Sequence, residues 1–126
     1  MPKTILIVDD YPDFAHLLEE RLKAEGFRAE TAFDGPAGIE KAKSLKPDLI
    51  LLDIMMPQVG GAEVRAELMK NPVTRGIPII FLTGLRAPQS KRTTPVYHDL
   101  KVIGKSRDFK ELLEAIQETL KNSPKV

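Results

Sequence analysis

Five polar residues in this sequence follow apolar runs and could do chemistry together. The first apolar run ends in Asp9-Asp10, a later one in Asp53, another in Thr83, and the last short one is followed by Lys105. Apolar runs that alternate with helix-period segments are typical of strands buried in a parallel sheet. Ligands bind beyond the carboxyl ends of such strands. We therefore expect these side chains to meet at one edge of the sheet.

The three carboxylates predict a cation site. Carboxylates brought together repel one another, and they stay ionised near neutral pH only if a cation joins them. An all-oxygen cluster of Asp9, Asp10 and Asp53 suits Mg²⁺, which takes one or two carboxylates and keeps waters or phosphate oxygens as its other ligands.

Each residue also has a simpler structural interpretation. Asp9 or Asp10 could cap the helix that follows, and Asp53 could be a turn residue. Threonine often ends a strand and most lysines are solvated, so Thr83 and Lys105 mean little by themselves. The functional interpretation depends on the set and on its placement at strand ends.

The elements that must position these residues alternate along the chain. Apolar or β-rich runs predict strands at residues 4–8, 27–31, 48–53, 77–82 and 101–103, and 3.6-residue periodicity predicts helices at 12–26, 36–45, 61–69 and 109–120. The core-facing stripes should be Phe14, Leu17, Leu18 and Leu22 in the first helix, and Phe109, Leu112, Leu113, Ile116 and Leu120 in the last. This alternation predicts one α/β domain over residues 1–126.

Composition narrows the class of protein. The chain has 126 residues, of which 42% are hydrophobic and 29% charged, as in a soluble globular domain. It has no cysteine, which excludes disulfides, thiolate zinc sites and cysteine nucleophiles. No apolar run could span a membrane and the N-terminus does not resemble a signal peptide, so we expect a cytoplasmic protein without a membrane partner. The first half is acidic and residues 86–110 are basic, which is compatible with a cation site and a separate partner surface but also with ordinary surface charge.

The motifs around these residues are those of a known family. An acidic pair ends the first strand, and Asp53 begins the block D-x-x-M-P-x-x-x-G that ends at Gly61. Thr83 stands in Leu-Thr-Gly, and Lys105 follows at close to the family's spacing. Over essentially its whole length the chain resembles a response-regulator receiver domain of bacterial two-component signalling, similar to the chemotaxis regulators. The resemblance implies a flavodoxin-like fold with a five-stranded parallel sheet of order 2-1-3-4-5 and helices on both faces.

The resemblance also implies a chemistry. Asp53 would take a phosphoryl group from a phosphohistidine of a sensor histidine kinase or phosphotransfer protein and form an aspartyl phosphate. Mg²⁺ would be held by Asp10, Asp53 and the backbone carbonyl of Met55, with Asp9 acting mainly through water. The chain would be a regulator and not an enzyme, with at most self-catalysed phosphotransfer and dephosphorylation.

Switching is the second implication. Phosphorylation would draw Thr83 and Lys105 inward and change the binding of an unidentified output protein at the face formed by the fourth helix, the fifth strand and the last helix. A dimer that depends on phosphorylation is compatible with this scheme. Two positions depart from the family pattern: Val102 replaces an aromatic switch residue, and Ser106 replaces the proline after the lysine. Both changes affect the route of the signal and not the chemistry.

Other functions fit less well. An aspartate-nucleophile phosphatase would have an acid where Met55 stands, and a nucleotide-binding module would have a glycine-rich loop after the first strand. One basic segment does not predict direct nucleic acid binding. The alternative that remains is a docking module on the same fold that works without phosphorylation, since the switch positions depart from the pattern.

Residues 84–100 fit the family least. Pro88 and Pro95 interrupt the segment that should hold the fourth helix, and no apolar stripe runs through it. We predict that this helix is short, distorted or absent and that the segment is mobile. Phosphorylation would act by ordering it, or the segment is a flexible surface loop with no signalling role.

Overall fold

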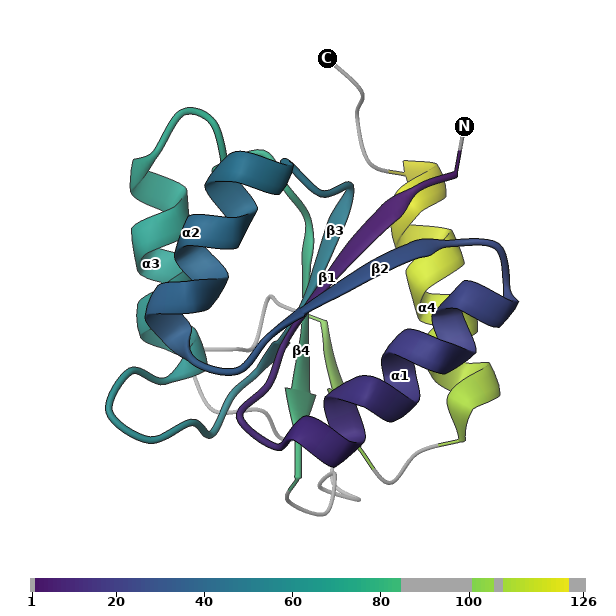
Figure 1. Ribbon diagram of the computed structural model, residues 1–126. Helices are drawn as coiled ribbons and strands as arrows, with labels where there is room; N and C mark the ends of the chain where they lie inside the picture. The colour runs from purple at the N-terminus through teal and green to yellow at the C-terminus, as the bar shows by residue number, and fades with distance from the viewer. Residues whose placement is uncertain (1, 85–100, 106–107, 123–126) are drawn as a thin grey trace.

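The computed structural model describes residues 2–84, 101–105 and 108–122. Figure 1 shows the elements, which follow the chain in the order β1 (Thr4–Val8), α1 (Pro12–Ala24), β2 (Arg28–Ala32), α2 (Gly35–Leu45), β3 (Leu49–Asp53), α3 (Gly61–Lys70), β4 (Ile79–Thr83), β5 (Val102–Gly104) and α4 (Phe109–Asn122). The predicted helix within residues 84–100 lies, apart from Gly84, outside the described residues.

The strands form one parallel sheet in the order β2-β1-β3-β4-β5. This order confirms the prediction of a flavodoxin-like α/β domain. The chain order reverses between β1 and β3, and the carboxyl ends of all five strands lie at the same edge. That edge is where ligands bind in open parallel sheets.

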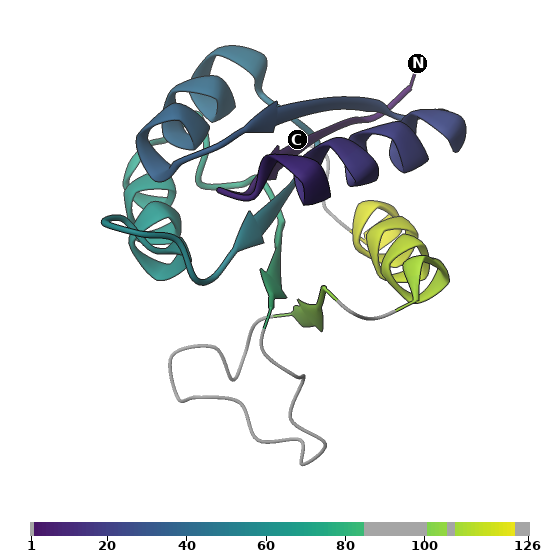
Figure 2. The same cartoon turned by 60° about the horizontal axis from the view of Figure 1, so that its bottom comes forward.

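Helices cover both faces of the sheet. Figures 1 and 2 show α1 and α4 on one face and α2 and α3 on the other. Alternate residues of each strand point to opposite faces, so the central strands supply two cores. One core joins Ile5, Ile7, Leu49, Leu51, Ile80 and Leu82 to α1 and α4, and the other joins Leu6, Val8, Ile50, Leu52 and Phe81 to α2 and α3.

The helices begin and end at recognisable signals. Pro12 occupies the first turn of α1, and Gly26, with a φ of 96°, follows its end in the left-handed region. The Asp34 carboxylate accepts a hydrogen bond from Ala37 N at 2.7 Å and caps α2. At α3, Gly60 N donates to Glu63 Oε1 at 3.0 Å. The signals at Pro12, Asp34 and Gly60 begin the helices that follow the carboxyl edge, and Gly26 ends α1 at the opposite edge.

One helix face was predicted wrongly. Leu17 was expected in the core, but it is 51% exposed, whereas Ala15, Leu18 and Leu22 are buried. Leu17 lies one residue, or about 100° of helix rotation, from Leu18. The small Ala15 completes the buried row, and a search for large apolar residues overlooks it.

The strand bounds differ slightly from the prediction. The ladder of β2 starts where Arg28 N donates to Lys3 O at 2.9 Å, one residue after the predicted start at Phe27. Pro78 lies directly before β4. Its carbonyl oxygen accepts a hydrogen bond from Ile50 N at 3.0 Å, and a proline is tolerated at this position because it has no N–H to donate to the sheet. These differences leave each predicted site residue at a strand end.

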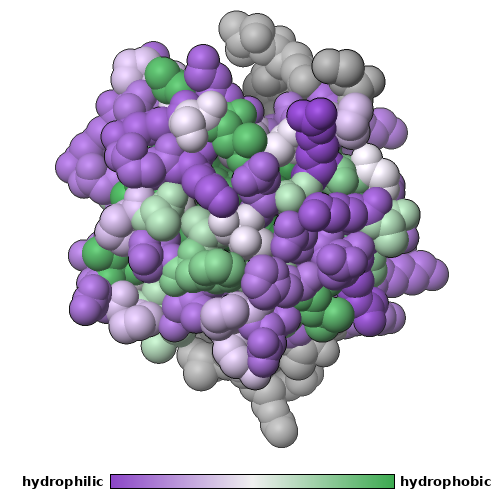
Figure 3. Space-filling model, in the orientation of Figure 1, coloured by the Kyte–Doolittle hydropathy of each residue, from purple (hydrophilic) through white to green (hydrophobic). Residues whose placement is uncertain are grey.

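Because apolar side chains fill the two cores, the surface is expected to be mostly hydrophilic. In Figure 3 hydrophilic side chains cover most of the face shown, and apolar ones appear in patches between them. Among the described residues, no helix is long and apolar enough to cross a membrane.

Candidate functional site

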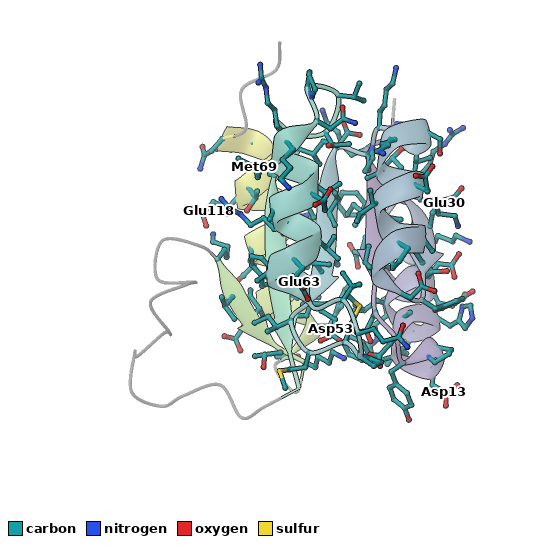
Figure 4. All side chains as sticks on the ribbon, turned by 90° about the vertical axis from the view of Figure 1, so that its left-hand side faces the viewer. Asp13, Glu30, Asp53, Glu63, Met69 and Glu118 are labelled. Atoms are coloured by element: carbon teal, nitrogen blue, oxygen red, sulfur yellow. The ribbon has the colours of Figure 1, made fainter. Side chains whose placement is uncertain are left out.

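Asp53 lies at the centre of the carboxyl edge. It is the last residue of β3, in the middle of the sheet, and it pairs in register with Leu82 of β4. Only 2% of its surface is exposed. Figure 4 shows Asp53 at the end of the sheet opposite to Met69 on α3. The buried strand β3 thus places a carboxylate at the carboxyl edge of the sheet.

Asp9 and Asp10 follow the neighbouring strand β1. Asp9 is fully buried, and its Oδ1 accepts a hydrogen bond from Tyr11 N at 3.0 Å. Asp10 is exposed. The N-cap of α1 is Tyr11, with no side-chain cap hydrogen bond. The simpler interpretation of the acidic pair as helix caps is therefore not supported.

Lys105 connects the two buried carboxylates. It follows β5, where its backbone N donates to Thr83 O at 2.7 Å. Its Nζ lies 2.8 Å from Asp9 Oδ2 and 3.3 Å from Asp53 Oδ2, and 18% of its side chain is exposed. Lys105 contacts both carboxylates because two buried negative charges attract it. Its inward movement on phosphorylation stays a prediction.

The charges of this cluster perturb one another. Burial and, next, the charge of Asp9 raise the pKa of Asp53 to about 7, although Lys105 opposes the rise. Burial lowers the pKa of Lys105, but Asp9 and Asp53 outweigh burial and raise that pKa above its ordinary value. The Asp53 carboxylate is thus crowded by negative charge that one lysine does not fully compensate.

The acidic cluster fits a divalent cation. Asp9, Asp10 and Asp53 each offer a carboxylate oxygen, and these oxygens all lie within 4.8 Å of one another. Asp9 Oδ2 is buried, and among the described residues the group that faces it is the Lys105 ammonium, through an ion pair. The donors are all hard oxygens, the kind that Mg²⁺ takes. The sequence prediction that these three side chains converge is confirmed.

The remaining predicted residues surround this cluster. Thr83 is 6% exposed at the end of β4, beside Gly104 of β5. Met55 is 62% exposed, and its backbone N donates to Asp53 Oδ1 at 3.3 Å. Val102 is half-buried and packs with the core of α2 and α3. The roles assigned to these residues stay predictions, and Ser106 lies outside the described residues.

Two further residues, Phe14 and Gly61, contact the site, and the sequence did not predict these contacts. The ring centroid of Phe14 lies 5.0 Å from Lys105 Nζ. Gly61 N donates to Ile54 O at 3.0 Å, and a Cβ on Gly61 would lie 2.6 Å from Asp53 O. Gly61 was visible as part of the sequence block, but Phe14 looked like one more member of an apolar stripe.

Comparisons with known proteins agree with this geometry. Residues 5–117 match the family described as the response regulator receiver domain. Over 85 residues, 68% of this chain, the sequence is 44% identical to the response regulator PleD of Caulobacter vibrioides, and over 120 residues, 95% of the chain, it is 36% identical to the response regulator ArlR of Staphylococcus saprophyticus. These matches span 19% and 53% of those relatives, so the chain covers at most about half of their length.

A solved structure shows the same likeness. The response regulator TrrA of Thermotoga maritima, in complex with Mg²⁺ and BeF, is 35% identical and superposes with a TM-score of 0.79. The superposition covers 92% of this chain and 97% of that one.

Proposed function

The chain belongs to the response regulator receiver domain family, and from this premise we propose that Asp53 accepts a phosphoryl group from a phosphohistidine of a sensor histidine kinase or phosphotransfer protein. The observation that carries the proposal is a carboxylate that is 2% exposed at a strand end, with Lys105 Nζ 3.3 Å away. A structural aspartate would be expected to have its charge matched, whereas Asp9 adds a second buried negative charge beside this one.

The residues present can support the transfer. A carboxylate oxygen of Asp53 attacks phosphorus, an O–P bond forms as the N–P bond of phosphohistidine breaks, and the imidazole keeps the bonding electron pair and takes a proton. Lys105 offers a cation and Thr83 a hydroxyl to the charge on the transferred group. Gly84 leaves room next to Thr83, because even a Cβ there would meet nothing nearer than Lys105 Cδ at 4.0 Å.

A bound Mg²⁺ completes this proposal. Asp10, Asp53 and the Met55 carbonyl would hold the ion, with Asp9 acting through water. When bound, the ion supplies positive charge next to the phosphoryl oxygens. The relative TrrA, whose structure contains Mg²⁺ and BeF, supports the choice of ion.

Partner binding is the proposed output. We propose that residues 1–126 act as one cytoplasmic receiver domain and that phosphorylation changes binding of an output protein through Thr83, Lys105 and Val102. Because the described part of α4 follows Lys105 closely, a shift of the lysine could reach the surface there. The mobility and ordering predicted for residues 84–100 concern, apart from Gly84, residues outside the described part of the chain.

The proposed function is tested with acetyl phosphate and Mg²⁺. Intact-mass spectrometry of the wild type should show one added phosphoryl group, and Asp53→Asn should show none. Asp13→Asn is the matched control, because Asp13 is an exposed aspartate on α1. An unchanged yield in Asp53→Asn would contradict the assignment, and partner capture that is equal with and without beryllofluoride would favour the phosphorylation-independent docking module.

The metal assignment is tested by titrating Mg²⁺. Asp10→Asn should weaken binding more than Asp9→Asn, because Asp10 is exposed at the carboxyl edge whereas Asp9 is buried against Lys105. Equal weakening in both variants would mean that Asp9 is also a direct ligand.

A further inference from the structure

Lys105 lies between charge on one side and an aromatic ring on another. Its Nζ contacts Asp9 and Asp53, and the Phe14 ring centroid lies 5.0 Å from the same nitrogen. A lysine ammonium within about 6 Å of a ring centroid is attracted by the negative face of the ring. The contact joins α1 to the residue that follows β5.

The surroundings of this contact make it stronger than a surface pair. Phe14 is half-buried and packs against the core of α1 and α4. Phe14 and Lys105 both line a pocket of about 250 Å³ together with Leu82 and Gly104. Since the lysine side chain is 18% exposed, the ring replaces part of its hydration. Cation–π attraction grows when the cation is desolvated in this way.

We propose that Phe14 is a positioning residue that holds the Lys105 ammonium at the phosphoacceptor, an inference that rests on the proposed function. A lysine has a flexible four-carbon stem, and fixing it is unfavourable in entropy. The two carboxylates alone do not fix it after transfer, because phosphorylation removes the charge of Asp53 and adds phosphoryl oxygens in its place. The Phe14 ring does not change in the reaction, so it keeps the ammonium near the site both before and after transfer.

A second contact of the same kind provides a control. The Arg21 guanidinium carbon lies 5.2 Å from the ring centroid of Phe109, again across the pocket between α1 and α4. This pair joins α1 to α4 beside the same pocket but involves neither Lys105 nor a carboxylate of the site. Arg21→Gln therefore removes a cation–π contact without removing the proposed one.

The test measures the rate at which acetyl phosphate and Mg²⁺ modify Asp53. Phe14→Leu keeps an apolar side chain without a ring and should slow phosphorylation roughly three- to tenfold. Phe14→Tyr keeps the ring face and should restore most of the rate, and Arg21→Gln should match the wild type. In a Lys105→Ala background, Phe14→Leu should cause no further slowing, because the effect acts through the lysine.

Fluorinated phenylalanines at position 14 separate attraction from packing. Mono-, di- and trifluorinated rings keep nearly the same shape but weaken the negative face in steps, so the rate should fall with each fluorine. The ring current of Phe14 should also shift the ε-proton NMR signals of Lys105 upfield, and Phe14→Leu should remove this shift. The fluorination series does not require a variant that changes the core volume.

The outcomes distinguish this inference from the proposed function. A wild type that gains no phosphoryl group would contradict both. A wild type that is modified, with equal slowing by Phe14→Leu in the Lys105→Ala background or a rate that does not depend on fluorination, would overturn the positioning role alone. Slowing by Arg21→Gln as large as by Phe14→Leu would also overturn it, since the loss would then belong to helix packing.

Discussion

The two faces of the sheet hold the site in different ways. On the α2 and α3 face, glycines bring the helix backbones close to the sheet. A Cβ on Gly38 would lie 2.7 Å from Cγ1 of the Val8 side chain, and one on Gly61 would lie 2.6 Å from the backbone oxygen of Asp53. On the α1 and α4 face, a pocket of about 250 Å³ opens, and long side chains make the contacts across it.

The two faces hold different residues of the site: the α2 and α3 face holds Asp53, and the α1 and α4 face holds Lys105. Backbone contacts with α3 fix the strand end that carries Asp53, since Gly61 N also bonds to Ile54 O. Side-chain contacts with α1 hold Lys105, which can adjust without moving a backbone. A fixed acceptor beside an adjustable cation suits a site whose charge changes when it is modified, because the rearrangement is directed to one face.

The largest expected effect tests the fixed side. Gly61→Ala should destabilise the fold by about 3 kcal/mol, the upper part of the usual range for overpacking, because the added Cβ meets the Asp53 carbonyl oxygen and Ile54 Cα at 2.6 and 3.0 Å. Backbone atoms cannot rotate away as a side chain can. Urea unfolding would measure the loss, and phosphorylation should fall because the strand end that carries Asp53 must shift.

Gly76→Ala is the matched control for that prediction. A Cβ on Gly76 would meet nothing within 4 Å. The free energy of unfolding should stay within about 0.5 kcal/mol of the wild type, as for most surface changes. If Gly61→Ala were equally neutral, the packing of α3 would not be what fixes Asp53.

The second prediction concerns how the charge of Asp53 changes the stability of the fold. The Asp53 carboxyl group, with its pKa raised from 3.8 to about 7, binds its proton more tightly in the folded chain than in the unfolded chain. The wild type should therefore lose stability as the pH rises through this window, and Asp53→Asn, which cannot ionise, should avoid that loss. In EDTA we expect Asp53→Asn to be more stable than the wild type at pH 8, by on the order of 2 kcal/mol, with a smaller gain at pH 5.

Melting temperatures at several pH values would check this prediction. Asp10→Ala should also raise the melting temperature in EDTA, but less, because Asp10 is exposed. Asp13→Asn, on an exposed turn of α1, should follow the wild type at each pH. A lower melting temperature in both Asp53→Asn and Asp10→Ala would mean that these carboxylates stabilise the fold without a cation.

The sequence predicted the acceptor side better than the lysine side, and the reason is physical. Strand alternation and the residues at strand ends are local signals, so the alternating α/β elements and the convergence of Asp9, Asp10 and Asp53 followed from them. The strand order was implied by the resemblance to the family and not by these signals. The contact of Phe14 with Lys105 joins residues far apart in the chain, and its distance depends on how α1 packs against the end of β5. No periodicity encodes that packing distance.

Small residues were the other source of error. Ala15 completes the buried row of α1, but large apolar residues dominate a periodicity search, and these placed Leu17 in the core. Gly61 was noticed as the end of a motif, yet its approach to Asp53 O depends on where α3 meets the sheet. In both cases what matters is how closely the neighbouring element approaches a residue with a small side chain or none. The sequence does not state that distance.

The smallest expected effect tests the adjustable face. Leu17→Ala should change the free energy of unfolding by less than about 0.5 kcal/mol, because Leu17 is 51% exposed at the rim of the pocket. Leu18→Ala, one residue further along α1, should cost about 3 kcal/mol because Leu18 is 4% exposed within the core. Urea unfolding of both variants gives the contrast directly. Similar losses in the two variants would mean that Leu17 packs against α4 and that the pocket is closed. Both faces of the sheet would then be packed to the same density. In that case the Lys105 side chain would have no space in which to change its position.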